Sequence, residues 1–170
     1  CTSSKGPKAY VKWCQAEAPT LMAAEEGQIF TYTWTYTPTS CMILTREGLD
    51  IDKNLYDAFM ADEEGIEYYQ LSVVPRENHE VGKADVEFWA YDFSKYLRLV
   101  SGTDTLSAHL YHLESNGGLK PGKTCLIAFD TSGLPQSERT LLIDGSPWGE
   151  EIPPLMISKH TFQQVPTLKI

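Results

Sequence analysis

One segment of this 170-residue chain has residue types and spacing that could cradle a phosphate. Residues 117–124 fit the pattern G-x-x-x-x-G-K-[ST], in which backbone N–H groups surround a phosphate, the lysine neutralises it and the hydroxyl holds Mg²⁺. That chemistry also needs a helix beginning at Lys123, because the helix N-terminus supplies part of the field. The residues that follow, 125–130, are apolar and typical of a strand. We therefore interpret the pattern as a hairpin loop and expect no nucleotide.

Two other groups of side chains are of the types that bind metals. His112 and Glu114 share one face of the strand expected over 108–114, but two ligands on one strand are more typical of a solvated polar face. Residues 50–54 (DIDKN) resemble the start of a calcium loop. That loop needs glycine at its sixth position and glutamate at its twelfth, where this chain has Leu55 and Ala61. We expect no metal and no other cofactor.

Nucleophilic catalysis would need a serine or cysteine beside a base. Residues 145–149 (GSPWG) do not fit the G-x-S-x-G turn of hydrolases, because Ser146 directly follows the first glycine. We interpret them as a loop that exposes Trp148, which could serve packing or contact a ligand. No local spacing places a nucleophile beside one of the four histidines, although such sites can assemble from distant positions. The sequence favours a protein that is not an enzyme.

The elements that must position these residues are mostly short strands separated by turns. Aromatic residues at positions 30, 32, 34 and 36 alternate with threonines, which predicts a half-buried strand over 28–37 with its aromatic face in the core. Further strands are expected over 10–14, 41–44, 67–74, 86–91, 108–114 and 124–130. This pattern favours a mainly β fold, an antiparallel two-layer sandwich with one or two short helices, with α+β as the alternative.

An acidic segment covers residues 47–67, which contain eight acidic residues and one basic residue, Lys53. Within it Asp52 is expected to cap a helix that ends before Gly65. The acids of this segment could contact a basic partner, and the candidate contacts are Asp50, Asp52, Asp62, Glu63 and Glu64. The alternative is an acidic face that is simply solvated.

Composition and charge exclude several classes of protein. Hydrophobic residues make up 42% and charged residues 22%, which is typical of a globular chain. The longest apolar runs are far shorter than the roughly 18–20 residues that span a bilayer. With 14 basic and 23 acidic residues the formal net charge is −9. Because an acidic surface repels phosphate backbones, we expect no nucleic-acid partner.

The chain opens with Cys1 and a small, polar lead, TSSKGPK. A cysteine followed by such a lead resembles a mature bacterial lipoprotein after removal of its signal peptide. The resemblance implies that Cys1 carries a diacylglycerol and an acyl chain such as palmitate. It also implies a flexible tether over residues 1–8, one domain over 9–170 and the lipid bilayer as a partner.

The second residue bears on the membrane that such a lipoprotein would occupy. Thr2 is not aspartate, the residue associated with retention in the inner membrane, and no acidic cluster follows Cys1. The resemblance therefore implies the outer membrane of a Gram-negative bacterium, on the periplasmic face.

The other three cysteines, Cys14, Cys41 and Cys125, cannot all pair within one chain if Cys1 carries lipid. They form either one disulfide and one thiol or three buried thiols. Because residues 41–44 and 125–128 look like interior strands, we favour three buried thiols.

These observations together predict an envelope lipoprotein with a non-enzymatic role, which holds or recognises another envelope protein. One alternative is a carbohydrate-binding module that uses exposed aromatic side chains such as Trp148, or the aromatic face of 28–37 if that face were exposed. A second alternative is a hydrolase whose site assembles only in the fold.

Overall fold

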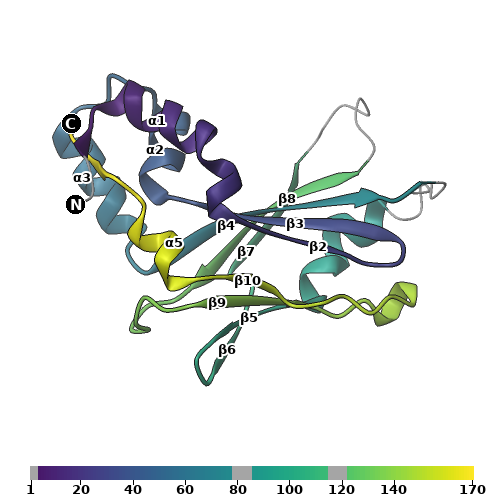
Figure 1. Ribbon diagram of the computed structural model, residues 1–170. Coiled ribbons are helices and arrows are strands. Elements are labelled where there is room, and N and C mark those ends of the chain that lie inside the picture. Colours follow the sequence, from purple (N-terminus) through teal and green to yellow (C-terminus); the bar gives the residue numbers. More distant parts are fainter. Residues whose placement is uncertain (1–3, 78–85, 115–121) are drawn as a thin grey trace.

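The structure is a computed structural model that describes residues 4–77, 86–114 and 122–170 (Figure 1). Two antiparallel sheets form its body. The first has the strand order β2-β3-β4-β8-β7, with β2 at Met22–Glu26, β3 at Phe30–Thr37, β4 at Ile66–Pro75, β8 at Lys123–Asp130 and β7 at Leu110–Glu114. The second has the order β10-β9-β5-β6, with β10 at Leu155–Ile157, β9 at Arg139–Ile143, β5 at Leu97–Ser101 and β6 at Asp104–Ser107. A short parallel pair joins β1 (Ser4–Lys5) to β11 (Thr167–Leu168).

Helices cover one end of this body and connect its strands. The α-helices are α1 (Pro7–Ala16), α2 (Thr39–Glu47), α3 (Lys53–Asp62) and α5 (Lys159–Gln163). Shorter turns are η1 (Ala18–Leu21), the π-helical turn η2 (Phe88–Asp92), η3 (Phe93–Tyr96) and η4 (Ser146–Trp148). Helices α1, α2 and α3 lie together at the end of the molecule where both chain ends are found (Figure 1). Among the described residues, no helix has the length and apolar character needed to cross a membrane.

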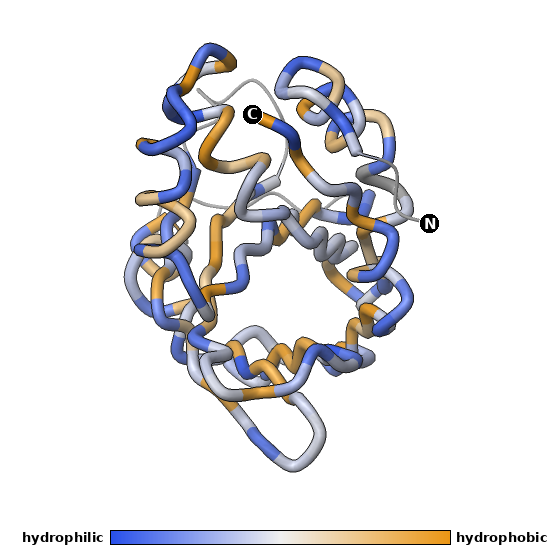
Figure 2. The backbone as a smooth tube through the Cα atoms, turned by 90° about the vertical axis from the view of Figure 1, so that its left-hand side faces the viewer, coloured by the Kyte–Doolittle hydropathy of each residue, from blue (hydrophilic) through white to orange (hydrophobic). Residues whose placement is uncertain are grey.

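The main core lies between the two sheets, which face each other across it in the view of Figure 2. The alternation predicted over 28–37 is confirmed by β3, where Tyr32 and Trp34 are fully buried and the threonines are half-buried. Trp34 pairs in register with Leu71 of β4, and Leu71 pairs with Cys125 of β8, so one row of buried side chains crosses three strands. The aromatic face of β3 therefore packs in the core and offers no exposed stacking platform.

The helices enclose a second, smaller core. It consists of Tyr10, Cys14, Ile43, Leu44 and Ile51, which come from α1, α2 and the residues before α3. The strands predicted over 10–14 and 41–44 are wrong, and this cluster shows why. Both segments are helical and pack against each other, because apolar residues four positions apart, such as Tyr10 and Cys14, share one helix face.

Two further expectations need correction. Residues 86–91 do not form the expected strand but lie in helical turns, which bury Trp89 against the main core. The sequence predicts a flexible tether over 1–8, but from Ser4 onwards these residues belong to the fold, because β1 pairs with β11 and α1 begins at Pro7. Backbone pairing with the C-terminal strand is the reason, and the sequence of the lead carries no sign of it. The fold class is confirmed as mainly β and antiparallel, with more helix than expected.

The helix cap predicted at Asp52 is present, and its loss should have a measurable cost. Asp52 Oδ1 accepts hydrogen bonds from Asn54 N (2.9 Å) and Leu55 N (3.3 Å) at the start of α3. Asp52→Ala is expected to lower the free energy of unfolding in urea by about 1 kcal/mol. The matched control is Asp50→Ala, which removes an exposed acid two positions earlier and should change stability much less. Equal effects of the two changes would contradict the capping role.

Candidate functional site

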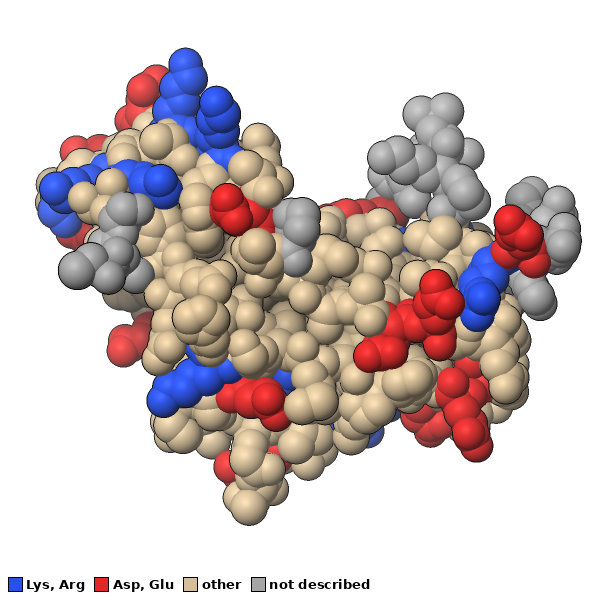
Figure 3. Space-filling model, in the orientation of Figure 1, with Lys and Arg blue, Asp and Glu red and all other residues tan. Residues whose placement is uncertain are grey.

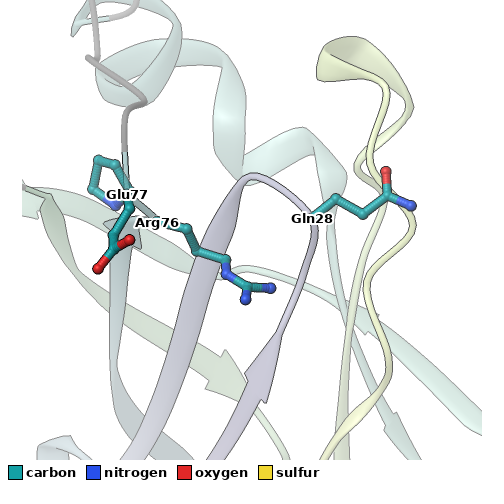
Figure 4. A pocket seen from close by; sticks show the side chains of 4 residues that line it. Gln28, Arg76 and Glu77 are labelled. Atoms are coloured by element: carbon teal, nitrogen blue, oxygen red, sulfur yellow. The ribbon is translucent and has the colours of Figure 1, made fainter.

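An open pocket lies where β2 turns into β3 and where β4 ends (Figure 4). It has a volume of about 670 Å³ and is lined by Gln28, Pro75, Arg76 and Glu77. Gln28, Arg76 and Glu77 are exposed, so the lining is mostly polar and charged. Sites for small molecules are mostly apolar and concave, so this pocket suits a polar or charged group of a larger partner better.

The β2–β3 hairpin holds Arg76 in place. The Arg76 backbone N–H donates to Ile29 O (2.8 Å), and its Nη1 donates to Gly27 O (2.7 Å). Figure 4 shows the guanidinium directed at the hairpin, while the Gln28 side chain extends on the other side. The Arg76 side chain remains 46% exposed, and its ion pair with Glu26 at 3.7 Å lies on the surface. The guanidinium is therefore positioned by the backbone and still open to a partner's carboxylate.

One buried carboxylate, that of Glu150, fastens this hairpin to the rest of the protein. Its Oε1 accepts hydrogen bonds from Ile29 N (2.6 Å) and Phe30 N (3.1 Å). Its Oε2 accepts from Tyr32 OH (2.5 Å) and Trp148 Nε1 (2.8 Å). Burial raises the pKa of Glu150, but these hydrogen bonds favour the charged form by more, so the pKa lies below its usual value. The site is thus built on a buried charge with four donors.

Gly27 leaves the space that this carboxylate occupies. A Cβ atom at position 27 would lie 2.0 Å from Glu150 Oε1, so any other residue would displace the carboxylate. The same group raises the pKa of the Tyr32 hydroxyl, together with burial, which is the larger cause. Tyr32 therefore stays protonated and acts as a donor, not as a base.

The stabilisation by Glu150 should depend on pH. Because its pKa is lower in the folded state, its contribution is present above the unfolded pKa of about 4.3 and is lost as the pH falls through the folded pKa. We expect urea unfolding to show a large stability difference between the wild type and Glu150→Gln at pH 7, and a smaller one at pH 3. A difference that does not change with pH would contradict this role.

The structure places Trp148 within an aromatic cluster rather than on an exposed loop. Its side chain is half-buried, and its ring centroid lies 5.8 to 5.9 Å from those of Phe88, Trp89 and Phe93. Its Nε1 donates a hydrogen bond to Glu150 Oε2. Trp148 therefore stabilises the β2–β3 hairpin through its hydrogen bond to Glu150. Its role as a contact for a ligand or partner stays a prediction.

The five acids predicted as contacts do not form one patch. Asp50 and Asp52 precede α3, whereas Asp62, Glu63 and Glu64 lie at its other end. A helix of ten residues is about 15 Å long, so the two groups are well separated. Asp50, Asp62 and Glu64 are exposed.

The two half-buried acids of the 47–67 segment, Glu63 and Glu67, make contacts within the protein. Glu63 accepts a hydrogen bond from Tyr68 OH (2.5 Å) and lies 3.7 Å from Arg46. Glu67 forms a bidentate ion pair with Arg139, in which Nη2 donates to Oε1 (2.8 Å) and Nε donates to Oε2 (3.0 Å). Both carboxylates therefore stabilise the fold, and the role of the exposed acids as contacts stays a prediction.

A second pocket lies beside the acids at the end of α3. Its volume is about 540 Å³, and Glu64 is the charged residue in its lining, which also contains Ala61, Gly65 and residues 131–134. Thr131 N donates to Gly65 O (2.8 Å), which brings the turn after β8 against the end of α3. Residues 131–134 are not predicted as part of a site, because the sequence there offers only Gly133 and the following Pro135, which are typical of a turn.

The residues considered as metal ligands or as a phosphate loop lie on strands of the five-stranded sheet. His112 and Glu114 lie on β7, and Glu114 accepts a hydrogen bond from Gln70 Nε2 (3.2 Å). Within 4–77, 86–114 and 122–170, no three Asp, Glu, His or Cys side chains are placed to hold a metal ion. Lys123 begins strand β8, which pairs with β7, so the helix that a phosphate loop needs is replaced by a strand. Residues 117–121 of that pattern lie outside the described residues.

Comparison with known proteins adds little to this geometry. No family model matches the chain, and no curated protein matches it. Among solved structures, the chain is similar to a protein of unknown function from Burkholderia pseudomallei K96243, with 10% sequence identity and a TM-score of 0.46. The match covers 92% of this chain and 91% of that one.

Proposed function

We propose that this protein is a lipoprotein held through Cys1 on the periplasmic face of the outer membrane, and that its domain binds another envelope protein without catalysing a reaction. The observation that carries the proposal is the distribution of charge over the molecule (Figure 3). Basic side chains, mixed with acidic ones, lie over the end that holds α1 and the chain termini. Acidic side chains gather over the end that holds the β2–β3 hairpin.

The end that holds α1 and the chain termini contains lysines that have no ionic partner among the described residues. They are Lys5, Lys8, Lys12 and Lys169. Lys169 N donates to Lys5 O (2.8 Å), so the lysines at the two chain ends are neighbours. A lysine near an anionic membrane surface contributes about 1 kcal/mol of attraction. An anchor at Cys1 would bring this end towards the phospholipid headgroups, where four lysines favour contact.

The acidic end would then face away from the membrane. Its exposed acids include Glu26 and Glu77 beside the open pocket and Asp144 and Glu151 on the neighbouring loop. The formal net charge of −9 gives the whole domain a field that attracts a basic partner. Asp62 and Glu64 beside the second pocket lie at the other end of the molecule, where α3 is found, and form a separate acidic surface. The expected partner is therefore a protein with a basic surface.

Fractionation of native cells tests the anchor. The wild-type protein should sediment with membranes and be released by detergent, but not by high salt. Cys1→Ser removes the lipidated thiol without touching a described residue, and this variant should remain in the soluble fraction. Wild-type protein that is soluble after lysis without detergent would overturn the proposal.

Photo-cross-linking tests the binding role. A photoreactive amino acid at Gln28, in the open pocket, should capture one defined envelope protein. The same group at Thr105, an exposed position on β6, should capture none. The double change Glu26→Gln/Glu77→Gln, beside this pocket, should lower the yield several-fold at low salt, whereas the control Asp104→Asn should not. Equal capture at positions 28 and 105 would contradict a specific partner.

A further inference from the structure

Two cysteines on neighbouring helices share a small pocket. Cys14 lies on α1 and Cys41 on α2, and both line a pocket of about 160 Å³. Tyr36 and Gln70 of the five-stranded sheet also line this pocket. Cys14 is 8% exposed, while Cys41 is half-buried. A reagent in solution can therefore reach Cys41 more easily than Cys14.

The two side chains lie close together. Both line the same small pocket and both belong to the small core between α1 and α2, so their thiols are neighbours. A disulfide needs an S–S distance of about 2.05 Å and Cα atoms about 4.4–6.8 Å apart. The proposal requires that rotation about the Cα–Cβ bonds and a shift of α1 against α2 bring the two sulfurs to that distance.

The two thiols differ in acidity. The hydrogen bond from Cys14 lowers the pKa of Cys41 and outweighs burial, and Thr45 lowers it further. Cys41 also lies in the first turn of α2, where the helix N-terminus favours a thiolate. The same hydrogen bond raises the pKa of Cys14, as does burial. Cys41 is therefore the nucleophile of the pair, and Cys14 stays a protonated thiol until its partner has reacted.

We propose that Cys14 and Cys41 form a reversible intramolecular disulfide by exchange with a small disulfide such as oxidised glutathione. The Cys41 thiolate attacks one sulfur of the reagent, its S–S bond breaks, and the leaving thiolate takes up a proton. Cys14 then loses its proton and attacks the Cys41 sulfur of the mixed disulfide, which releases the second thiol. Two cysteine thiols are oxidised, and one reagent disulfide is reduced to two thiols.

The third described cysteine is a built-in control. Cys125 is fully buried on β8, with Tyr111 OH 3.0 Å from its sulfur. Burial raises its pKa to about 11, although the hydrogen bond with Tyr111 lowers it. Cys125 should therefore stay reduced under conditions that oxidise Cys14 and Cys41. The disulfide between Cys14 and Cys41 does not depend on the proposed function or on the cell compartment.

The disulfide would tie the N-terminal helix to the first helix of the connection between β3 and β4. It closes a loop of 28 residues, from Cys14 to Cys41. Constraining the unfolded chain in this way should raise the melting temperature by about 5–10 °C. The oxidised protein would thus hold α1 firmly against the domain.

The experiment uses the full chain carrying Cys1→Ser, so that three thiols remain. The protein is incubated with oxidised glutathione, blocked with iodoacetamide, digested and mapped by mass spectrometry without reduction. We expect a Cys14–Cys41 cross-linked peptide, an alkylated Cys125 only after unfolding, and the higher melting temperature before but not after reduction. Cys125→Ser should behave in the same way.

Single substitutions separate the two roles. Cys14→Ser should accumulate a stable glutathione adduct on Cys41, because the resolving thiol is missing. Cys41→Ser should form almost no adduct on Cys14. Circular dichroism confirms that each variant is folded. The proposal is overturned if the folded Cys1→Ser protein keeps all three thiols, if a disulfide involves Cys125, or if Cys14 captures glutathione as readily as Cys41.

Discussion

Replacing Arg139 with methionine is expected to lower the free energy of unfolding by about 3–5 kcal/mol. Arg139 is 1% exposed and begins β9, while its partner Glu67 lies on β4 in the other sheet. Its Nε and Nη2 donate to the two carboxylate oxygens, and Nη1 donates to Ser101 Oγ (2.7 Å). Without the guanidinium, the carboxylate of Glu67 is left beside the core with Tyr69 OH as its remaining partner.

A double-mutant cycle distinguishes the uncompensated charge from lost packing. Glu67→Met/Arg139→Met removes both charges and should cost clearly less than Arg139→Met alone, because no charge is left unpaired. Urea unfolding of the wild type, both single variants and the double variant measures this coupling. If the double variant is as unstable as the sum of the two single variants, the ion pair does not connect the sheets in the way the structure indicates.

Trp34→Ala is expected to cost a similar amount, about 3–5 kcal/mol, for a different reason. The Trp34 side chain is fully buried in the main core and stacks on Tyr69 with a centroid distance of 4.5 Å. Truncation leaves a cavity between the sheets that neighbouring β-strands cannot close. Chemical unfolding should show the loss without a change in fold, as judged by circular dichroism.

Trp34→Phe provides the informative comparison. Trp34 Nε1 is buried and has no hydrogen-bond partner in the part of the chain that the structure describes. Removing an unsatisfied buried donor recovers about 1–3 kcal/mol, which offsets much of the smaller ring's lost packing. We therefore expect Trp34→Phe to cost less than about 2 kcal/mol. A loss as large as that of Trp34→Ala would mean that the indole N–H is satisfied.

Local patterns in the sequence identified the elements that carry their own signal. The aromatic and threonine alternation over 28–37 predicted β3, and Asp52 predicted the start of α3. The strand expected over 124–130 is β8, and it pairs with β7 as expected. Each of these signals lies within a few residues, where backbone propensity and side-chain period act directly.

The tertiary structure alone decided the state of the short apolar runs and the make-up of the site. Segments of five residues such as 10–14 fit a buried helix turn as well as a strand, and only the small core between α1 and α2 selects the helix. The groups that hold the site together are distant in sequence. Glu150 is separated from Tyr32 by 118 positions, and Arg139 from Glu67 by 72. A buried charge is stable only where folding brings its donors together, so no local pattern could have marked these residues.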